Sequence, residues 1–400
     1  MQQATDFQVK TVLQPRFAAV APQRLGYVDA VRILMTVLVI MVHAAVTYGS
    51  LGGWFYQDPV KDETTAILLT LFAMVCQSFF MGLFFFISGY FTPGSVDRKG
   101  LLAFGKDRLL RLGIPLVVFI YLLSKVPIYL GEVGRGDTNM PFFQFAGKRF
   151  WQAIDAGPTW FLAVLLVFAA GYAVCRLVAA HLAAFTTSKQ LPVPGKATLL
   201  GFGLVIALSM FVVSQFNPLV SSPTLLGAIR FLVSFMPQYI LMYVAGLLAY
   251  RNDWLLRLSG ASLTFWGWLA AGLTLCLPVF TFLSGAVDGN PNILFTGLTW
   301  QCLVMNLWIG LACVAYSLTI LLWLRQSRFA DGRLVKTGGA NTFTVYLIHP
   351  LVLVPLTALG LSHLAIPPLL KFVTASLITV VVCYGLASLL RRIPGAKAIL

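Results

Sequence analysis

Charged residues are scarce in this chain of 400 residues: Asp, Glu, Lys and Arg together make up 10%, whereas hydrophobic residues make up 59%. The mean hydropathy of +0.86 lies outside the range of soluble globular proteins. Long apolar runs of this kind are stable in hydrocarbon and not in water. The composition therefore excludes a soluble enzyme and predicts an all-α, polytopic transmembrane helix bundle whose partner is the lipid bilayer.

Residues that bind metals or form redox centres are also few. The chain has four histidines and six cysteines, with no Cys-x-x-Cys pair and no His-Glu-x-x-His. No metal site is predicted, and the cysteines are expected to pack as small hydrophobic residues. The net charge of +15 would suit nucleic acid, but the basic residues lie in short loops and form no continuous basic face. We therefore expect no nucleic-acid partner.

Ten apolar runs are long enough to cross about 30 Å of hydrocarbon. They lie near residues 28–49, 66–91, 112–130, 158–180, 197–216, 225–250, 261–284, 300–324, 342–359 and 365–390. The first run follows a polar tail, 1–26, so we expect it to remain in the mature protein and not to be a signal peptide. Lys and Arg concentrate in both tails and in alternate loops, which predicts a multi-pass protein of the cell membrane with both termini cytoplasmic. The membrane domain would then span 27–390, with a C-terminal tail at 391–400.

Three ionisable residues, Asp29, Arg32 and His43, interrupt the first apolar run. Each such group costs about 2.5–3.5 kcal/mol at a helix centre, so these residues are candidates for function. Eleven residues make about three helical turns, which places Arg32 and His43 on one face roughly 16 Å apart. The alternative is that Asp29 and Arg32 form an ion pair at the membrane boundary and that His43 is a structural residue.

A second histidine, His349, follows Tyr346 by one helical turn in the ninth run, which is expected to run in the same direction as the first. Two intramembrane histidines favour a polar cavity. A neutral imidazole there can take a proton from a hydroxyl that attacks an electrophile, and His43 is the preferred base. His349 has the alternative of a purely structural hydrogen bond to a neighbouring helix.

Several other residues are candidates for binding. Arg108 and Arg111 lie one turn apart at the inner end of the third run, where guanidinium groups suit the phosphates of a cytosolic donor or, alternatively, lipid headgroups. Trp160 is expected at the outer interface, either in an aromatic belt, which we favour, or against a sugar ring. The remaining cationic residues within the runs, Lys125, Arg230 and Lys371, are expected to extend to water near helix ends, unless one of them binds an anionic group.

Five segments occur in an order that points to a known family. They are Tyr27-Val-Asp-Ala-Val-Arg32 followed by ten residues and His43, Phe85-Phe-Ile-Ser-Gly-Tyr90, Lys106-Asp-Arg-Leu-Leu-Arg111, Trp160-Phe-Leu162 and Tyr346-Leu-Ile-His349. Together they resemble the acyltransferase-3 family of integral membrane O-acyltransferases over about residues 24–390, and most closely its glucan-modifying, succinyl-transferring branch. Ile33 stands where the family usually has glycine after the arginine.

The resemblance implies transfer of an acetyl or succinyl group from cytosolic acyl-CoA, a donor cosubstrate and not a permanently bound cofactor, to a hydroxyl of a glycan or similar acceptor outside. The predicted site comprises catalytic His43, Arg32 and Asp29, donor-binding Arg32, Arg108 and Arg111, and substrate-binding Trp160, Tyr346 and His349. Two alternatives from other classes stay open. One is a transporter of a small anionic or lipid-linked substrate, and the other is a sensor or assembly scaffold.

Overall fold

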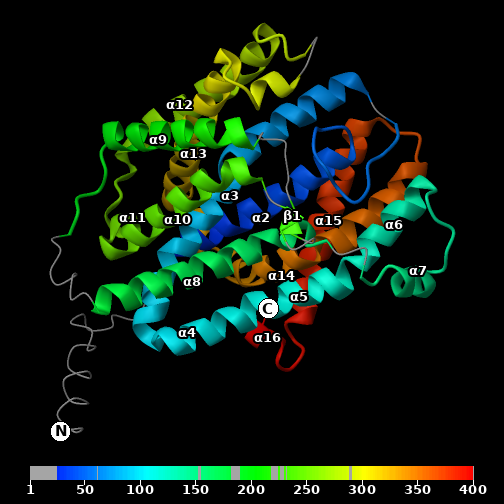
Figure 1. Cartoon of the computed structure of the whole chain (residues 1–400), viewed down its shortest axis with the longest axis horizontal. Helices are drawn as coiled ribbons and strands as arrows, with labels where there is room; N and C mark the ends of the chain where they lie inside the picture. Colours follow the sequence, from blue (N-terminus) through cyan, green and yellow to red (C-terminus); the bar gives the residue numbers. More distant parts are fainter. Residues whose placement is uncertain are drawn as a thin grey trace.

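The computed structural model of the protein describes residues 25–60, 62–151, 155–181, 190–217, 224–225, 229–230, 232–287 and 291–399. Nearly all of the expected N-terminal tail, residues 1–24, and Lys61, between the first two expected spans, lie outside the described residues. The described part is a bundle of long helices (Figure 1), with a two-residue antiparallel pair, β1 (Thr224–Leu225) and β2 (Ile229–Arg230), as its only strands. The predicted all-α fold class is therefore confirmed.

Ten helical segments among the described residues are long and apolar enough to cross a membrane. They are α2 (Gly26–Thr47), α3 (Glu63–Lys99), α4 to α6 (Leu101–Arg135), α8 (Trp160–His181), α9 (Lys196–Phe216), α10 (Met236–Arg251), α12 (Leu263–Leu283), α13 (Trp300–Gln326), α14 (Arg333–Pro355) and α15 (Pro368–Leu390). Short helices are α7 (Phe142–Lys148), α11 (Trp254–Arg257) and α16 (Ala396–Ile399). The number and order of the spans agree with the sequence.

Several predicted boundaries were wrong. The segment 92–111, expected as a loop, is almost entirely helical: α3 continues through Pro93 to Lys99, Gly100 turns the chain at φ +75°, and α4 begins at Leu101. Similarly, α14 begins at Arg333, inside the expected loop 325–340. The length of an apolar run reflects the thickness of the hydrocarbon layer. These helices extend beyond that layer through turns that carry charged residues, so the apolar runs did not predict their ends. In contrast, α10 begins later than expected, because Pro237 fits the first helical turn.

The third span is irregular. Two π-helical segments, Leu109–Gly113 and Phe119–Leu123, flank the short helix α5 (Ile114–Val118), which carries Pro115 in its first turn. A proline removes one backbone N–H from the helical ladder, and a wider turn can absorb that loss. The chain therefore changes its helical pitch around Gly113-Ile-Pro115. This change rotates the side chains that follow it relative to those that precede it.

Helices α2 and α14 lie side by side in the interior and run parallel. Asp29 of α2 contacts Gly339 of α14 near the starts of both helices, and His43 contacts His349 near their ends. Helices α3 and α13 complete the most buried part of the bundle, whereas α12 is largely exposed on the surface. Figure 1 shows α2 crossing the middle of the molecule with α12 at its edge. The predicted parallel direction of the first and ninth spans is confirmed.

Candidate functional site

Three aromatic rings, from α2, the loop that follows it and α14, stack at the end of α2. The imidazole of His43 lies on the indole of Trp54, with ring centroids 3.9 Å apart and planes at 17°. His349 Nε2 is 3.0 Å from His43 Nδ1, so the two histidines share a hydrogen bond across the α2–α14 interface. The side chain of His349 is fully buried. The two predicted histidines therefore form one unit, and His349 does bond to a neighbouring helix, with His43 as its partner.

The hydrogen bonds assign the protons of this pair. His349 Nδ1 lies 2.6 Å from the carbonyl oxygen of Tyr346, which can only accept, so His349 carries its proton on Nδ1. Its Nε2 is then an acceptor in the neutral ring, and the Nδ1–H of His43 donates to it. The remaining nitrogen of a neutral His43, Nε2, is consequently unprotonated. That atom has the lone pair that a general base needs.

Tyr346 and Trp160 both approach Phe161 in an aromatic cluster next to this pair. The Tyr346 hydroxyl donates to the carbonyl oxygen of Pro158, just before α8, and its ring centroid is 6.0 Å from that of Phe161. Trp160 stacks on Tyr239 of α10 at 5.7 Å and also approaches Phe161 at 6.3 Å. Trp160 is half-buried against these neighbouring rings.

Asp29 and Arg32 form an ion pair at the start of α2, with Asp29 Oδ1 3.3 Å from Arg32 Nη1. The guanidinium is partly exposed, at 33%, so it remains accessible to an anion. Gly338 and Gly339 of α14 lie against this turn: a Cβ on Gly339 would meet Asp29 at 2.8 Å, and one on Gly338 would meet Ile33 at 3.0 Å. Close packing at Ile33 is therefore provided by glycine on the partner helix.

Arg108 and Arg111 have different surroundings. Arg108 is half-buried, stacks over the Phe104 ring at 5.0 Å, and its Nε has no hydrogen-bond acceptor in the part of the chain that the structure describes. Arg111 lies in the π-helical segment, is exposed, and pairs with Asp107 at 3.2 Å. Because the π-helical turn between the two arginines is wider than an α-helical turn, their side chains point in different directions. Arg108 is thus the better placed of the two to bind an anion inside the bundle.

Two lysines that were expected to reach water are buried. Lys371 of α15 is about 1% exposed and pairs with Asp58 at 3.0 Å, so the prediction for this residue was wrong. Lys125 is 3% exposed, and its Nζ lies 5.8 Å from the centre of the Phe150 ring. The loop after α2 folds back onto the bundle and brings Asp58 to Lys371, which sequence spacing does not indicate. The side chain of Arg230, the third such residue, lies outside the described part of the structure.

The segment 48–60, which we call the 48–60 loop, was not predicted to contribute to the site. It begins with Tyr48, turns at Gly49 and Gly52 with φ of +128° and +138°, and returns over the end of α2. Burial, reinforced by the Asp58 carboxylate, raises the pKa of the Tyr48 hydroxyl, which therefore keeps its proton. The sequence feature that could have indicated this contribution is the group of aromatic residues that follows Gly52-Gly53 in a short loop.

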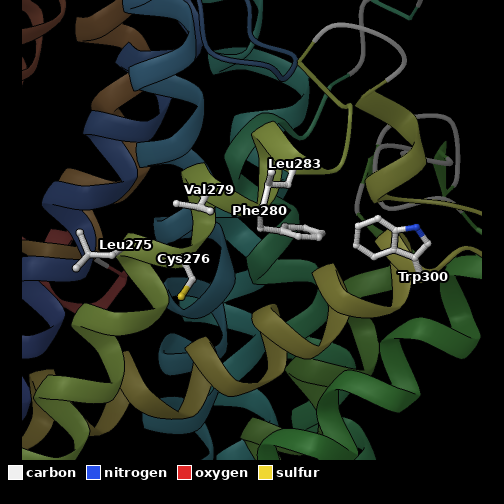
Figure 2. Close-up of a pocket in the computed structure, with 6 residues that line it drawn as sticks. All are labelled: Leu275, Cys276, Val279, Phe280, Leu283 and Trp300. Atoms are coloured by element: carbon white, nitrogen blue, oxygen red, sulfur yellow. The ribbon is translucent and has the colours of Figure 1, made fainter.

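A separate apolar hollow lies on the lipid-facing side of the bundle. Figure 2 shows its lining, formed by α12 and the first residue of α13: Leu275, Cys276, Val279, Phe280, Leu283 and Trp300. None of the predicted site residues lines it, and its walls offer almost no polar atoms for a charged substrate. We therefore place the candidate site at the histidine pair and not at this hollow.

Comparison with known proteins identifies the family of the chain. A family model described as an acyltransferase domain matches residues 25–388, nearly the whole chain. The chain belongs to the acyltransferase-3 family. Family membership confirms the resemblance found in the sequence, and with ten apolar helices this family member is a multi-pass membrane protein. No solved structure gives a significant match to the chain.

Curated relatives of this acyltransferase-3 chain include two proteins named glucans biosynthesis protein C. The one from Shigella dysenteriae serotype 1 is 31% identical over 152 residues, and the one from Escherichia coli K12 is 30% identical over 152 residues. In each case the match covers 37% of this chain and 38% of the relative. The matched region thus spans little more than a third of these relatives. Their names agree with the glucan-modifying branch suggested by the sequence motifs.

Proposed function

We propose that this protein is a membrane O-acyltransferase that moves an acetyl or succinyl group from cytosolic acyl-CoA to a hydroxyl of a glycan on the outer side of the membrane. The observation that supports this most directly is the hydrogen-bonded His43–His349 pair, in which His43 Nε2 is left as the basic atom. Family membership supports acyl transfer as the reaction class. The names of the curated relatives support a glucan as the acceptor.

The proposed reaction needs one proton carrier. The acceptor hydroxyl oxygen attacks the thioester carbonyl carbon while its proton passes to His43 Nε2. The tetrahedral intermediate then breaks its carbon–sulfur bond, and the leaving CoA thiolate takes that proton back from His43. His349 keeps the His43 ring in the required tautomer through the 3.0 Å bond between them. No covalent acyl-enzyme is needed to balance these steps.

The cationic groups at the other end of α2 suit the donor. The Arg32 side chain is partly exposed, Arg108 is half-buried, and Arg108 Nε has no acceptor among the described residues. Guanidinium groups bind phosphate oxygens strongly, as the phosphates of CoA require. We therefore assign the CoA end of the donor to the Arg32 end of the bundle and the acyl group to the histidine pair. Asp29 holds Arg32 in position.

The test replaces His43 with alanine in protein reconstituted into lipid vesicles. With acetyl-CoA or succinyl-CoA and a glucan oligosaccharide, His43→Ala is expected to lower transfer by about 10²- to 10⁴-fold, the contribution of a positioned general base. Release of free CoA thiol and mass of the oligosaccharide measure the reaction. His363→Ala, which changes an exposed histidine, is the matched control and should retain full activity. Normal transfer by folded His43→Ala protein would contradict the assignment, as would wild-type protein that binds no acyl-CoA.

A further inference from the structure

The 48–60 loop is fixed to four helices of the bundle. Two backbone N–H groups of the loop donate to the bundle: Asp58 N to Thr47 O of α2 at 2.8 Å, and Leu51 N to Thr70 Oγ1 of α3 at 3.2 Å. Two side chains of the bundle donate to the loop: Arg135 Nη1 of α6 to Phe55 O at 2.8 Å, and Lys371 Nζ of α15 to Asp58 Oδ2 at 3.0 Å. A Cβ on Gly131 of α6 would collide with the Phe55 carbonyl oxygen, so the loop lies directly on that helix. Trp54, between these anchors, is therefore held in place by contacts on both sides.

Trp54 covers the histidine pair with a polar atom that has no partner. Its indole is stacked on His43 at 3.9 Å and is nearly parallel to His349, with planes at 10°. Its Nε1 is buried, and no acceptor lies within hydrogen-bonding distance of it among the described residues. In contrast, the buried indole nitrogen of Trp308 donates to the Leu273 carbonyl at 2.8 Å. A buried N–H without an acceptor destabilises the folded state unless a ligand supplies one.

We propose that Trp54 is a catalytic residue that donates its indole N–H to the carbonyl oxygen of the acyl thioester. This inference rests on the proposed function and adds a residue outside the family-like motifs. When the acceptor oxygen bonds to the carbonyl carbon and its proton moves to His43 Nε2, the carbonyl π electrons move to oxygen, where the indole N–H stabilises the negative charge. On collapse the charge returns to the carbonyl, the carbon–sulfur bond breaks, and the thiolate takes the proton from His43.

The stacked geometry supports two parts of this role, the orientation of the His43 ring and the donation of a hydrogen bond by Trp54. The face-to-face contact fixes the plane of the His43 ring, because the imidazole has Trp54 on one side and a hydrogen bond to His349 at its edge. The donor and the base belong to adjacent, nearly parallel rings with centroids 3.9 Å apart, and the proposal places the reacting carbonyl group between Trp54 Nε1 and His43 Nε2. Since the loop is anchored to α2, α3, α6 and α15, the donor needs little rearrangement as charge develops.

Trp54→Phe tests the proposal, because it keeps an aromatic ring on His43 and removes only the N–H. In vesicles containing the full-length protein, with acetyl-CoA and a glucan oligosaccharide, kcat is expected to fall about 10²- to 10³-fold, the usual loss for one oxyanion donor. The Kd of acetyl-CoA and the yield of folded protein should stay within twofold of wild type. Trp268→Phe, which changes an exposed tryptophan of α12, is the matched control and should leave kcat unchanged.

The outcomes separate this proposal from the function on which it rests. Wild-type protein that transfers no acyl group from acetyl-CoA or succinyl-CoA would overturn the proposed function. Active wild type with an equally active Trp54→Phe variant would overturn only the role of Trp54. A variant that loses acetyl-CoA affinity or folded yield in parallel with kcat would show a packing role and would likewise overturn the proposal. Loss confined to kcat supports it.

Discussion

The two hydrogen-bonded histidines, His349 buried and His43 half-buried, differ in the atoms that they have available. Both nitrogens of His349 are engaged, one with the Tyr346 carbonyl and one with His43, whereas His43 keeps Nε2 unprotonated in the neutral pair. His349 is therefore assigned as a positioning residue and His43 as the base. The same hydrogen bonds explain why a fully buried histidine is tolerated, because both of its polar atoms are satisfied.

This difference predicts unequal effects of substitution. His349→Ala removes the acceptor for His43 Nδ1–H and should lower acyl transfer, but less than His43→Ala does, because the base itself remains. His349→Gln offers an amide oxygen as acceptor and should recover part of the lost rate. Initial rates of CoA release, measured across pH for both variants and for His43→Ala, show which substitution lowers acyl transfer more. A His349→Ala variant that is as inactive as His43→Ala, with no recovery in His349→Gln, would place His349 in the reaction itself.

Contact between α2 and α14 depends on small residues at the Arg32 end. Gly339→Ala would place a Cβ 2.8 Å from Asp29 Cβ, a contact that forces one of the helices to shift. We expect this variant to disturb the Asp29–Arg32 pair and to weaken acyl-CoA binding by about tenfold or more, because guanidinium contacts depend on geometry. Isothermal titration with acetyl-CoA measures the effect.

A matched glycine lies in a lipid-facing helix. A Cβ on Gly267 of α12 would meet no other residue within 4 Å, so Gly267→Ala should leave binding unchanged and slightly favour the helix. Both variants make the same chemical change in a helix, and only one of them affects the α2–α14 contact. Equal binding by Gly339→Ala and wild type would show that the packing at Asp29 is not required for the donor site.

The helices and part of the site were predictable because the bilayer imposes simple rules. Span length follows from hydrocarbon thickness, and the spacing of Asp29, Arg32 and His43 on one helix follows from its pitch. The closeness of His349 to His43 was only an inference from two rare residues, and the structure supplied its geometry. Helix ends at Lys99 and Arg333 were missed, because charged turns extend beyond the apolar run.

The contribution of Trp54 was not predictable from the sequence by the same rules. Its position depends on the return of the 48–60 loop, which in turn depends on the pairing of Asp58 with Lys371, 313 residues further along the chain. Likewise, the separate environments of Arg108 and Arg111 result from a π-helical turn that an i, i+3 spacing does not reveal. Local periodicity thus predicts helices well and predicts long-range loop packing poorly.

The Asp58–Lys371 pair connects the 48–60 loop, which covers the histidines, to α15, the last spanning helix. Both side chains are at most 2% exposed, and removing one partner of a buried pair typically costs about 3–5 kcal/mol because the other charge is left unpaired. Lys371→Met should therefore lower the free energy of unfolding in detergent by about that amount, whereas the double variant Asp58→Asn with Lys371→Met should recover much of the loss. Lys397→Met, at an exposed site in α16, should have no measurable effect. If the double variant were as unstable as Lys371→Met alone, the loss would stem from the packing of the lysine side chain and not from an unpaired Asp58 carboxylate.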